Sequence, residues 1–154
     1  MGDALGLSLD EAYSLKRLYF SRLPRVGTFI TRVVDTAKIR GNIFNWLGRR
    51  YTFPDPAWAY KAPNYLIQGS CADVMKTAMV NVAAYLRDNN LKSRVILSIH
   101  DELICEIDLT EVQTVPRVVV EIMESAYPGR NIRLKVDPEW SAVSMADKQK
   151  GYPV

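Results

Sequence analysis

The sequence has 154 residues, of which 48% are hydrophobic and 24% are charged, and its formal net charge is +3. A chain of this length builds one hydrophobic core and is short for two, so we expect a single domain over residues 1–154. No apolar run approaches the roughly 18 residues of a membrane span, and no secretory leader pattern is present, so we expect no membrane partner. The expected location is the cytoplasm, or the host cytoplasm if the source is viral.

The distribution of charge indicates what kind of partner to expect, and the positions of the cysteines indicate whether disulfides or a zinc site are present. Residues 1–62 carry ten lysines and arginines against five acidic residues, whereas residues 63–154 carry ten against twelve. We therefore expect the first part to face a polyanion. Cys71 and Cys105 lie far apart and the chain has one histidine, which argues against a disulfide framework and against a zinc site.

Two helices are predicted in the first forty residues. Ser8 and Glu11 have the spacing of a capping box, and apolar residues follow at helical intervals, which predicts a helix over residues 9–20. Pro24 suits the start of a second helix, which Gly41 ends.

A short hairpin is predicted next, over residues 42–53, with Gly48 in its turn. Arg49 and Arg50 follow this glycine. Arginine forms paired hydrogen bonds with phosphate oxygens and glycine lets a backbone approach closely, so the turn suits a nucleic-acid strand. A solvated basic turn is an equally good interpretation.

The longest predicted helix begins at Asn64 and continues for about five turns, because apolar residues recur every three or four positions as far as Leu86. Asn64 and Gln68 are four residues apart and therefore share a face, and Gly69 leaves room for a close neighbour. On spacing alone, both amides also fit the solvent face of an amphipathic helix.

A second hairpin is predicted from strands at 94–99 and 103–107, joined by His100, Asp101 and Glu102. The turn lacks the Gly, Asn-Gly or Asp-Gly that a tight hairpin prefers, which suggests that these residues are present for their side chains. Two carboxylates at a hairpin tip suit a divalent cation. The alternative is that they are solvated turn residues.

The remaining elements complete an α+β pattern. Residues 112–127 are predicted as a helix with Pro116 in its first turns, residues 132–136 as a short strand, and residues 146–154 as a loose tail. We expect an antiparallel sheet centred on residues 94–107, with the helix from Asn64 packed near it.

Three motifs occur in a fixed order. Residues 48–51 read Gly-Arg-Arg-Tyr, residues 64–76 fit N-x-x-x-Q-G-x-x-A-D-x-x-K, and residues 98–103 read Ser-Ile-His-Asp-Glu-Leu. They resemble a hairpin, a helix motif and motif C of family A (DNA polymerase I-like) DNA polymerases. The resemblance covers residues 1–140 and implies a palm-type antiparallel sheet packed with helices. Residues 1–40 would be a helical fingers-to-palm segment and residues 41–154 the palm.

The resemblance also implies template-directed DNA synthesis for DNA replication, on primer-template DNA with dNTP as substrate. Such phosphoryl transfer uses two Mg²⁺ ions, for which Asp101 would be a metal ligand and catalytic residue, with Glu102 as a secondary catalytic residue. Amide donors can test the acceptors that every base pair presents in the minor groove. The implied DNA-binding residues are His100 at the primer terminus, Asn64, Gln68, Arg49 and Arg50.

Two features of the family are missing from this sequence. It has neither the earlier D-Y-S-type aspartate of motif A nor the R-x-x-x-K fingers helix that grips the triphosphate. We therefore expect the chain to be inactive alone and to require a separate polymerase chain that supplies both, including the carboxylate that completes the two-metal site. Apolar side chains left partly uncovered are then expected, with Val26, Phe29, Trp46 and Trp58 as candidates.

Two other interpretations fit the same residues. One is a non-catalytic DNA-binding remnant that keeps the tip carboxylates without their chemistry. The other is a metal-dependent nuclease or hydrolase, which would need further clustered carboxylates.

Overall fold

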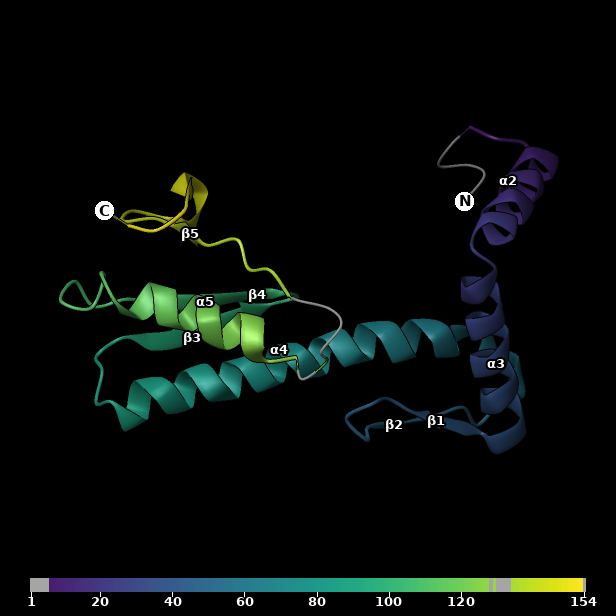
Figure 1. Cartoon of the computed structure of the whole chain (residues 1–154), viewed down its shortest axis with the longest axis horizontal. Coiled ribbons are helices and arrows are strands. Elements are labelled where there is room, and N and C mark those ends of the chain that lie inside the picture. The colour runs from purple at the N-terminus through teal and green to yellow at the C-terminus, as the bar shows by residue number, and fades with distance from the viewer. Residues whose placement is uncertain (1–5, 128, 130–133, 154) are drawn as a thin grey trace. The chain divides into compact units, whose positions relative to one another are not determined.

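The computed structural model describes residues 6–127, 129 and 134–153 (Figure 1). The chain forms two compact units, residues 1–69 and 70–154, and the long helix α4 (Ala62–Asp88) contributes residues to both. The described residues combine helices with three two-stranded antiparallel sheets, which confirms the predicted α+β class.

The first unit opens with two helices whose ends follow the predicted signals. Helix α2 (Leu9–Arg22) begins at Ser8, and the predicted capping box is present, because the Ser8 hydroxyl accepts the Glu11 N–H while the Glu11 carboxylate accepts the Ser8 N–H. Helix α3 (Pro24–Arg40) ends at Gly41, whose φ of +67° is the left-handed conformation that favours glycine.

The rest of the first unit packs a small hairpin and a 3₁₀ helix against α3. Strands β1 (Asn42–Phe44) and β2 (Arg50–Thr52) pair with Ile43 opposite Tyr51, and η1 (Pro56–Lys61) leads directly into α4. The buried residues of this core are Ala37, Ile43, Phe53, Ala59 and Ala62. Two alanines on consecutive turns let η1 and the start of α4 approach their neighbours closely.

The second unit is built around the second predicted hairpin. Strands β3 (Arg94–Ile99) and β4 (Glu102–Glu106) are antiparallel, and the pairing passes from Val95–Cys105 to Leu97–Ile104, so Ile96 is the extra residue of a β-bulge. One face of the hairpin packs against α4 and against α5 (Val115–Ser125). The buried residues of this core are Val82, Leu86, Val115 and Val119, with Val95, Leu103 and Cys105 packed on them.

Apolar side chains remain uncovered in both units. The four predicted residues are all at least partly uncovered: Phe29, Trp46 and Trp58 are exposed, and Val26 is half-buried. Strand β3 also exposes apolar side chains that the sequence did not single out, and these are Ile96, Leu97 and Ile99.

Three predictions near the C-terminus need correction. The tail was predicted to be loose, but β6 (Gln149–Lys150) pairs with β5 (Glu139–Trp140), and η2 (Met145–Asp147) joins the two strands. In the strand predicted over 132–136, Ile132 and Arg133 lie outside the described residues. Residues 134–136 form no strand, and the Val136 N–H donates to the Glu124 carboxylate rather than to a neighbouring strand. The predicted helix over 112–127 begins only at Val115.

No helix within the described ranges is long and apolar enough to cross a bilayer.

Candidate functional site

The tip of the β3–β4 hairpin presents the predicted acidic residues to solvent. Ile99 pairs with Glu102, so His100 and Asp101 alone form the turn. His100 has a φ of +52°, a conformation that glycine or asparagine adopts more readily than histidine. His100, Asp101 and Glu102 are all exposed. A turn that accepts an unfavourable backbone conformation in order to display an imidazole and carboxylates is typical of a functional position.

The base of the same hairpin is fixed by a network around Glu111. The Glu111 carboxylate accepts hydrogen bonds from the N–H groups of Lys92 and Ser93, at 2.8 and 2.9 Å, and from the Ser93 hydroxyl at 2.6 Å. These bonds, led by that from the Ser93 hydroxyl, lower the pKa of Glu111. The buried Ser93 also accepts the Asp108 N–H at 3.0 Å, so both strands are anchored where they are farthest from the tip.

Lys148 reaches the acidic tip from the C-terminal segment. Its ammonium group lies 3.4 Å from the Glu102 carboxylate and 3.7 Å from that of Glu139. Sequence reasoning missed Lys148, and no local signal could reveal it, because 46 residues separate it from Glu102. Glu102 is therefore engaged with a lysine, which distinguishes its surroundings from those of Asp101.

The hairpin tip offers one carboxylate, that of Asp101, as a ligand for a divalent cation. Asp101 offers the carboxylate oxygens that Mg²⁺ prefers. The described part of the chain contains no group of three or more His, Cys, Asp or Glu side chains that could hold a metal ion. These residues therefore do not form a complete metal site by themselves.

The predicted amide pair lies in the first unit, at the start of α4. The Asn64 side chain donates a hydrogen bond to the Gln68 carbonyl oxygen at 3.4 Å, and both side chains are exposed. The shared face expected from their spacing is present. Side-chain amides displayed from a rigid helix can hydrogen-bond to a ligand with little loss of conformational freedom.

The two predicted arginines follow a turn that Asn45 organises. The buried Asn45 side-chain oxygen accepts the N–H groups of Leu47 and Arg49, at 3.1 and 2.9 Å, and Gly48 adopts a φ of +83°. Arg49 and Arg50 are exposed, and Arg50 is the first residue of β2 rather than a turn residue. Sequence reasoning missed Asn45, although an asparagine three residues before a glycine is a recognisable turn signal.

Tyr51 holds this hairpin against the first turns of α4. A Cβ at Gly69 would overlap the Tyr51 hydroxyl, so the close neighbour that Gly69 was expected to admit is Tyr51. The Tyr51 ring also lies 6.0 Å from that of Tyr65, which stacks on Phe53 at 5.7 Å. Packing of Tyr51 on Gly69 therefore connects the strand that carries Arg50 with the helix that carries Gln68.

Comparison with known proteins identifies the relationship. The model of DNA polymerase family A matches residues 1–144. The chain belongs to DNA polymerase family A. It is 36% identical over 149 residues to DNA polymerase I of Geobacillus stearothermophilus, covering 88% of this chain, and 32% identical over 156 residues to that of Chloroflexus aurantiacus, covering 94%. In each case the chain spans 17% of the relative's length.

A solved structure of a family A polymerase shares this fold. The POL domain of Pol1 from M. smegmatis, in complex with DNA primer-template and dNTP, matches with a TM-score of 0.76 at 36% identity. The match covers 82% of this chain and 24% of that one. The predicted family and the α+β fold class are thus confirmed, whereas the residue roles expected within the family stay predictions.

Proposed function

We propose that this family A chain forms part of a template-directed DNA polymerase that acts in DNA replication. The observation that carries the proposal is the exposed His100-Asp101 turn, closed by Glu102, in a chain that the family model matches over residues 1–144. Asp101 is the proposed Mg²⁺ ligand and catalytic residue. When bound, Mg²⁺ supplies charge neutralisation at the phosphate under attack.

The other predicted residues have distinct roles in this proposal. Glu102 assists at the catalytic centre, where the Lys148 ammonium group lies 3.4 Å from its carboxylate. His100 donates a hydrogen bond to the primer terminus, while Asn64 and Gln68 test minor-groove acceptors that occur in every base pair. Arg49 and Arg50 contact backbone phosphates, so DNA binding is independent of sequence.

The substrates proposed are primer-template DNA and dNTP, as in the related Pol1 complex. Polymerase residues that these 154 positions do not contain, namely a motif A aspartate and a triphosphate-binding fingers helix, are supplied in this proposal by polypeptide outside these positions. The exposed apolar residues of β3 are the surface on which such residues would be expected to pack.

Primer extension in a reassembled enzyme tests the proposal. This chain would replace the matching segment of the DNA polymerase I of Geobacillus stearothermophilus, and extension of a labelled primer would be measured with Mg²⁺ and dNTP. Asp101→Ala should abolish extension. The control is Asp88→Ala, which removes an exposed carboxylate from the end of α4 and should leave extension unchanged. Equal activity of the two variants would refute the role of Asp101.

The amide pair needs its own measurement, because its proposed role is in base-pair checking rather than affinity. Gln68→Ala should slow extension from a matched terminus and alter tolerance of a mismatched one, whereas Asn81→Ala, at an exposed position of the same helix, should do neither. If Gln68→Ala changes neither rate nor discrimination, the amide face of α4 is only a solvated surface.

The nuclease alternative gains no support, because the clustered carboxylates that it needs do not occur among the described residues.

A further inference from the structure

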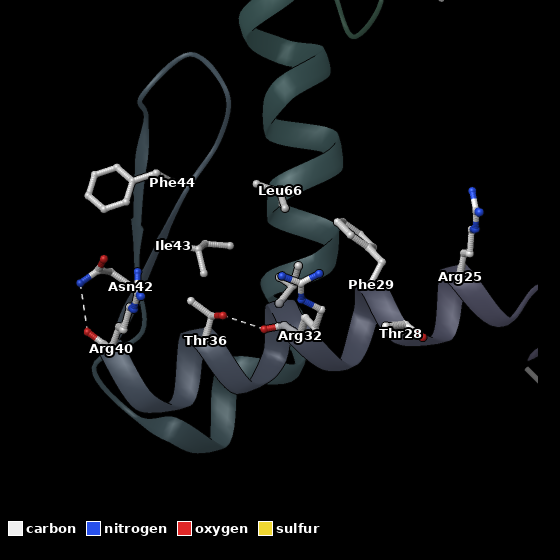
Figure 2. Close-up of a pocket in the computed structure, with 11 residues that line it drawn as sticks. Arg25, Thr28, Phe29, Arg32, Thr36, Arg40, Asn42, Ile43, Phe44 and Leu66 are labelled. Carbon is white, nitrogen blue, oxygen red and sulfur yellow. Dashed lines mark hydrogen bonds between the residues drawn. The ribbon is translucent and has the colours of Figure 1, made fainter. Parts of the chain in front are cut away.

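A groove lies in the first unit, next to the hairpin that carries Arg49 and Arg50, since its lining residue Phe44 pairs with Arg50 across the two strands. It has a volume of about 640 Å³ and is lined by residues of α3, β1 and the start of α4 (Figure 2). Three arginines of α3 line it, namely Arg25, Arg32 and Arg40, and no lining residue is acidic. Apolar side chains line it as well, with Ile43 and Leu66 contributing from the two other elements.

The charged hydrogen-bond donors of this groove are its three guanidinium groups. Its three uncharged polar side chains already donate to nearby backbone carbonyls: Thr28 to Pro24 at 3.1 Å, Thr36 to Arg32 at 2.7 Å, and Asn42 to Arg40 at 3.0 Å. None of the three guanidinium groups forms an ion pair within the described part of the chain. Guanidinium groups are positively charged and have N–H donors but no acceptor, so they favour a ligand that carries negative charge.

The spacing of the arginines favours an extended anion over a single one. They stand at intervals of seven and eight residues on one helix, which spreads their Cα atoms over about 22 Å at 1.5 Å per residue. One phosphate group cannot meet side chains distributed over that length. A chain of phosphodiesters can, because each of its units carries a charge.

Two exposed aromatic rings indicate which polyanion fits. Phe29 and Phe44 line the same groove, and 39% and 58% of their surfaces are exposed. Phe29 lies between Arg25 and Arg32 along α3, and exposed rings beside cationic groups are what unpaired bases stack on in proteins that bind single-stranded nucleic acid. A duplex hides the faces of its bases within its own stack, and aspartate and glutamate side chains have no flat ring to stack on a phenylalanine.

We infer that this groove, defined by Arg25, Phe29, Arg32, Arg40 and Phe44, binds a segment of single-stranded nucleic acid. The inference rests on the proposed function in one respect, which is that the protein encounters nucleic acid. The binding is sequence-independent, since phosphates and base faces carry little base identity.

The first test measures binding of the full chain to a fluorescent oligodeoxythymidylate across a range of salt concentrations. Arg25→Gln, Arg32→Gln and Arg40→Gln together should weaken binding at least tenfold and reduce the salt slope by about two units, the value for three single-strand phosphate contacts. The matched control removes Lys16, Arg17 and Arg22 of α2 in the same way. Equal losses in both variants would overturn the inference, because attraction would then be unlocalised.

The second test addresses the stacking. Phe44→Leu keeps an apolar side chain but should weaken binding about tenfold, the loss expected for one base stack. Tyr13→Leu, at an exposed aromatic position on α2, is the control and should have no effect. Circular dichroism and thermal unfolding verify each fold, and the three single arginine variants replace the triple variant if it unfolds.

Competitors identify the ligand. An oligouridylate of equal length should compete as well as the DNA strand, whereas polyglutamate of equal charge and duplex DNA should compete poorly. Equal competition by polyglutamate would instead assign the groove to an acidic peptide. Equal competition by duplex DNA in a chain whose Arg49 and Arg50 are both replaced by glutamine, so that the proposed duplex contacts are lost, would exclude a single-strand site. If the reassembled parent enzyme does not extend a primer but the groove variants lose oligonucleotide binding, the polymerase proposal is refuted and this inference stands. If the reassembled enzyme extends a primer but the groove variants bind the oligonucleotide as the parent does, this inference is refuted and the polymerase proposal stands.

Discussion

The Tyr51 hydroxyl occupies the volume that a side chain at position 69 would need. Gly69 is therefore required by tertiary packing, since its own helix has no need for a glycine there. The hydroxyl is buried and has no hydrogen-bond partner among the described residues. This contact joins the arginine-bearing hairpin to the helix that carries Asn64 and Gln68.

Gly69→Ala should lower the free energy of unfolding by about 1–3 kcal/mol, because the methyl group overlaps the Tyr51 ring and hydroxyl. Tyr51→Phe alone should be neutral or stabilising, because it removes an unpaired buried hydroxyl. In the double variant, part of the loss of stability caused by Gly69→Ala should remain, because the ring carbon Cζ still lies 2.6 Å from the added Cβ position. Urea unfolding of the four proteins gives the coupling. Strict additivity would contradict a direct contact.

Asn45→Ala should destabilise the first hairpin by about 1–3 kcal/mol, because the buried Asn45 oxygen accepts two backbone N–H groups of the turn. Asn45→Asp keeps an acceptor oxygen in place and should cost less. Thermal unfolding measures both. Asn45→Ala should also weaken binding of primer-template DNA, because the turn that positions Arg49 loses its hydrogen bond to Asn45. If alanine and aspartate are equally harmful, the acceptor is not what matters at this position.

Cys105 should resist thiol reagents while Cys71 reacts. Burial raises the pKa of Cys105 from 9.0 to about 11, whereas Cys71 is exposed. At pH 8 only about one Cys105 in a thousand is a thiolate in the folded protein. Titration with a chromogenic disulfide should therefore label one thiol quickly and the second only after denaturation. Two thiols of equal rate would show that Cys105 is accessible.

The same shift gives a pH dependence of stability. The folded protein holds the Cys105 proton more tightly than the unfolded chain, so the free energy of unfolding should fall as pH rises from 9.0 through about 11. Cys105→Ala should remove this part of the alkaline loss.

Glu111 should make the second unit sensitive to acid. Hydrogen bonds from Ser93 and Lys92 lower its pKa below the usual 4.5, so its contribution to stability is present above pH 4.5 and is lost as pH falls through the lowered value. Glu111→Gln should reduce the dependence of Tm on pH in this window. Glu121→Gln, at an exposed position of α5, should leave that dependence intact. Identical acid profiles for Glu111→Gln and the parent would contradict this account.

Much of the site could be predicted because its signals are local. The two residues of the His100-Asp101 turn, the exposed arginines after Gly48 and the shared face of Asn64 and Gln68 all depend on contacts within a few positions of the chain. What could not be predicted is which partners these residues meet. Lys148 approaches Glu102 across 46 residues, and no periodicity records such a distance.

The sequence by itself determined the helix ends at Ser8 and Gly41, the two hairpins and the motifs of the polymerase family. Capping, hydrophobic spacing and turn conformation are properties of neighbouring residues, so they can be recognised without coordinates. Only the tertiary structure decided that Tyr51 fills the space over Gly69, that β6 pairs with β5, and that arginines and phenylalanines of α3 and β1 line one groove. These contacts join segments far apart in the chain, and their energy depends on how the backbone brings the surfaces together.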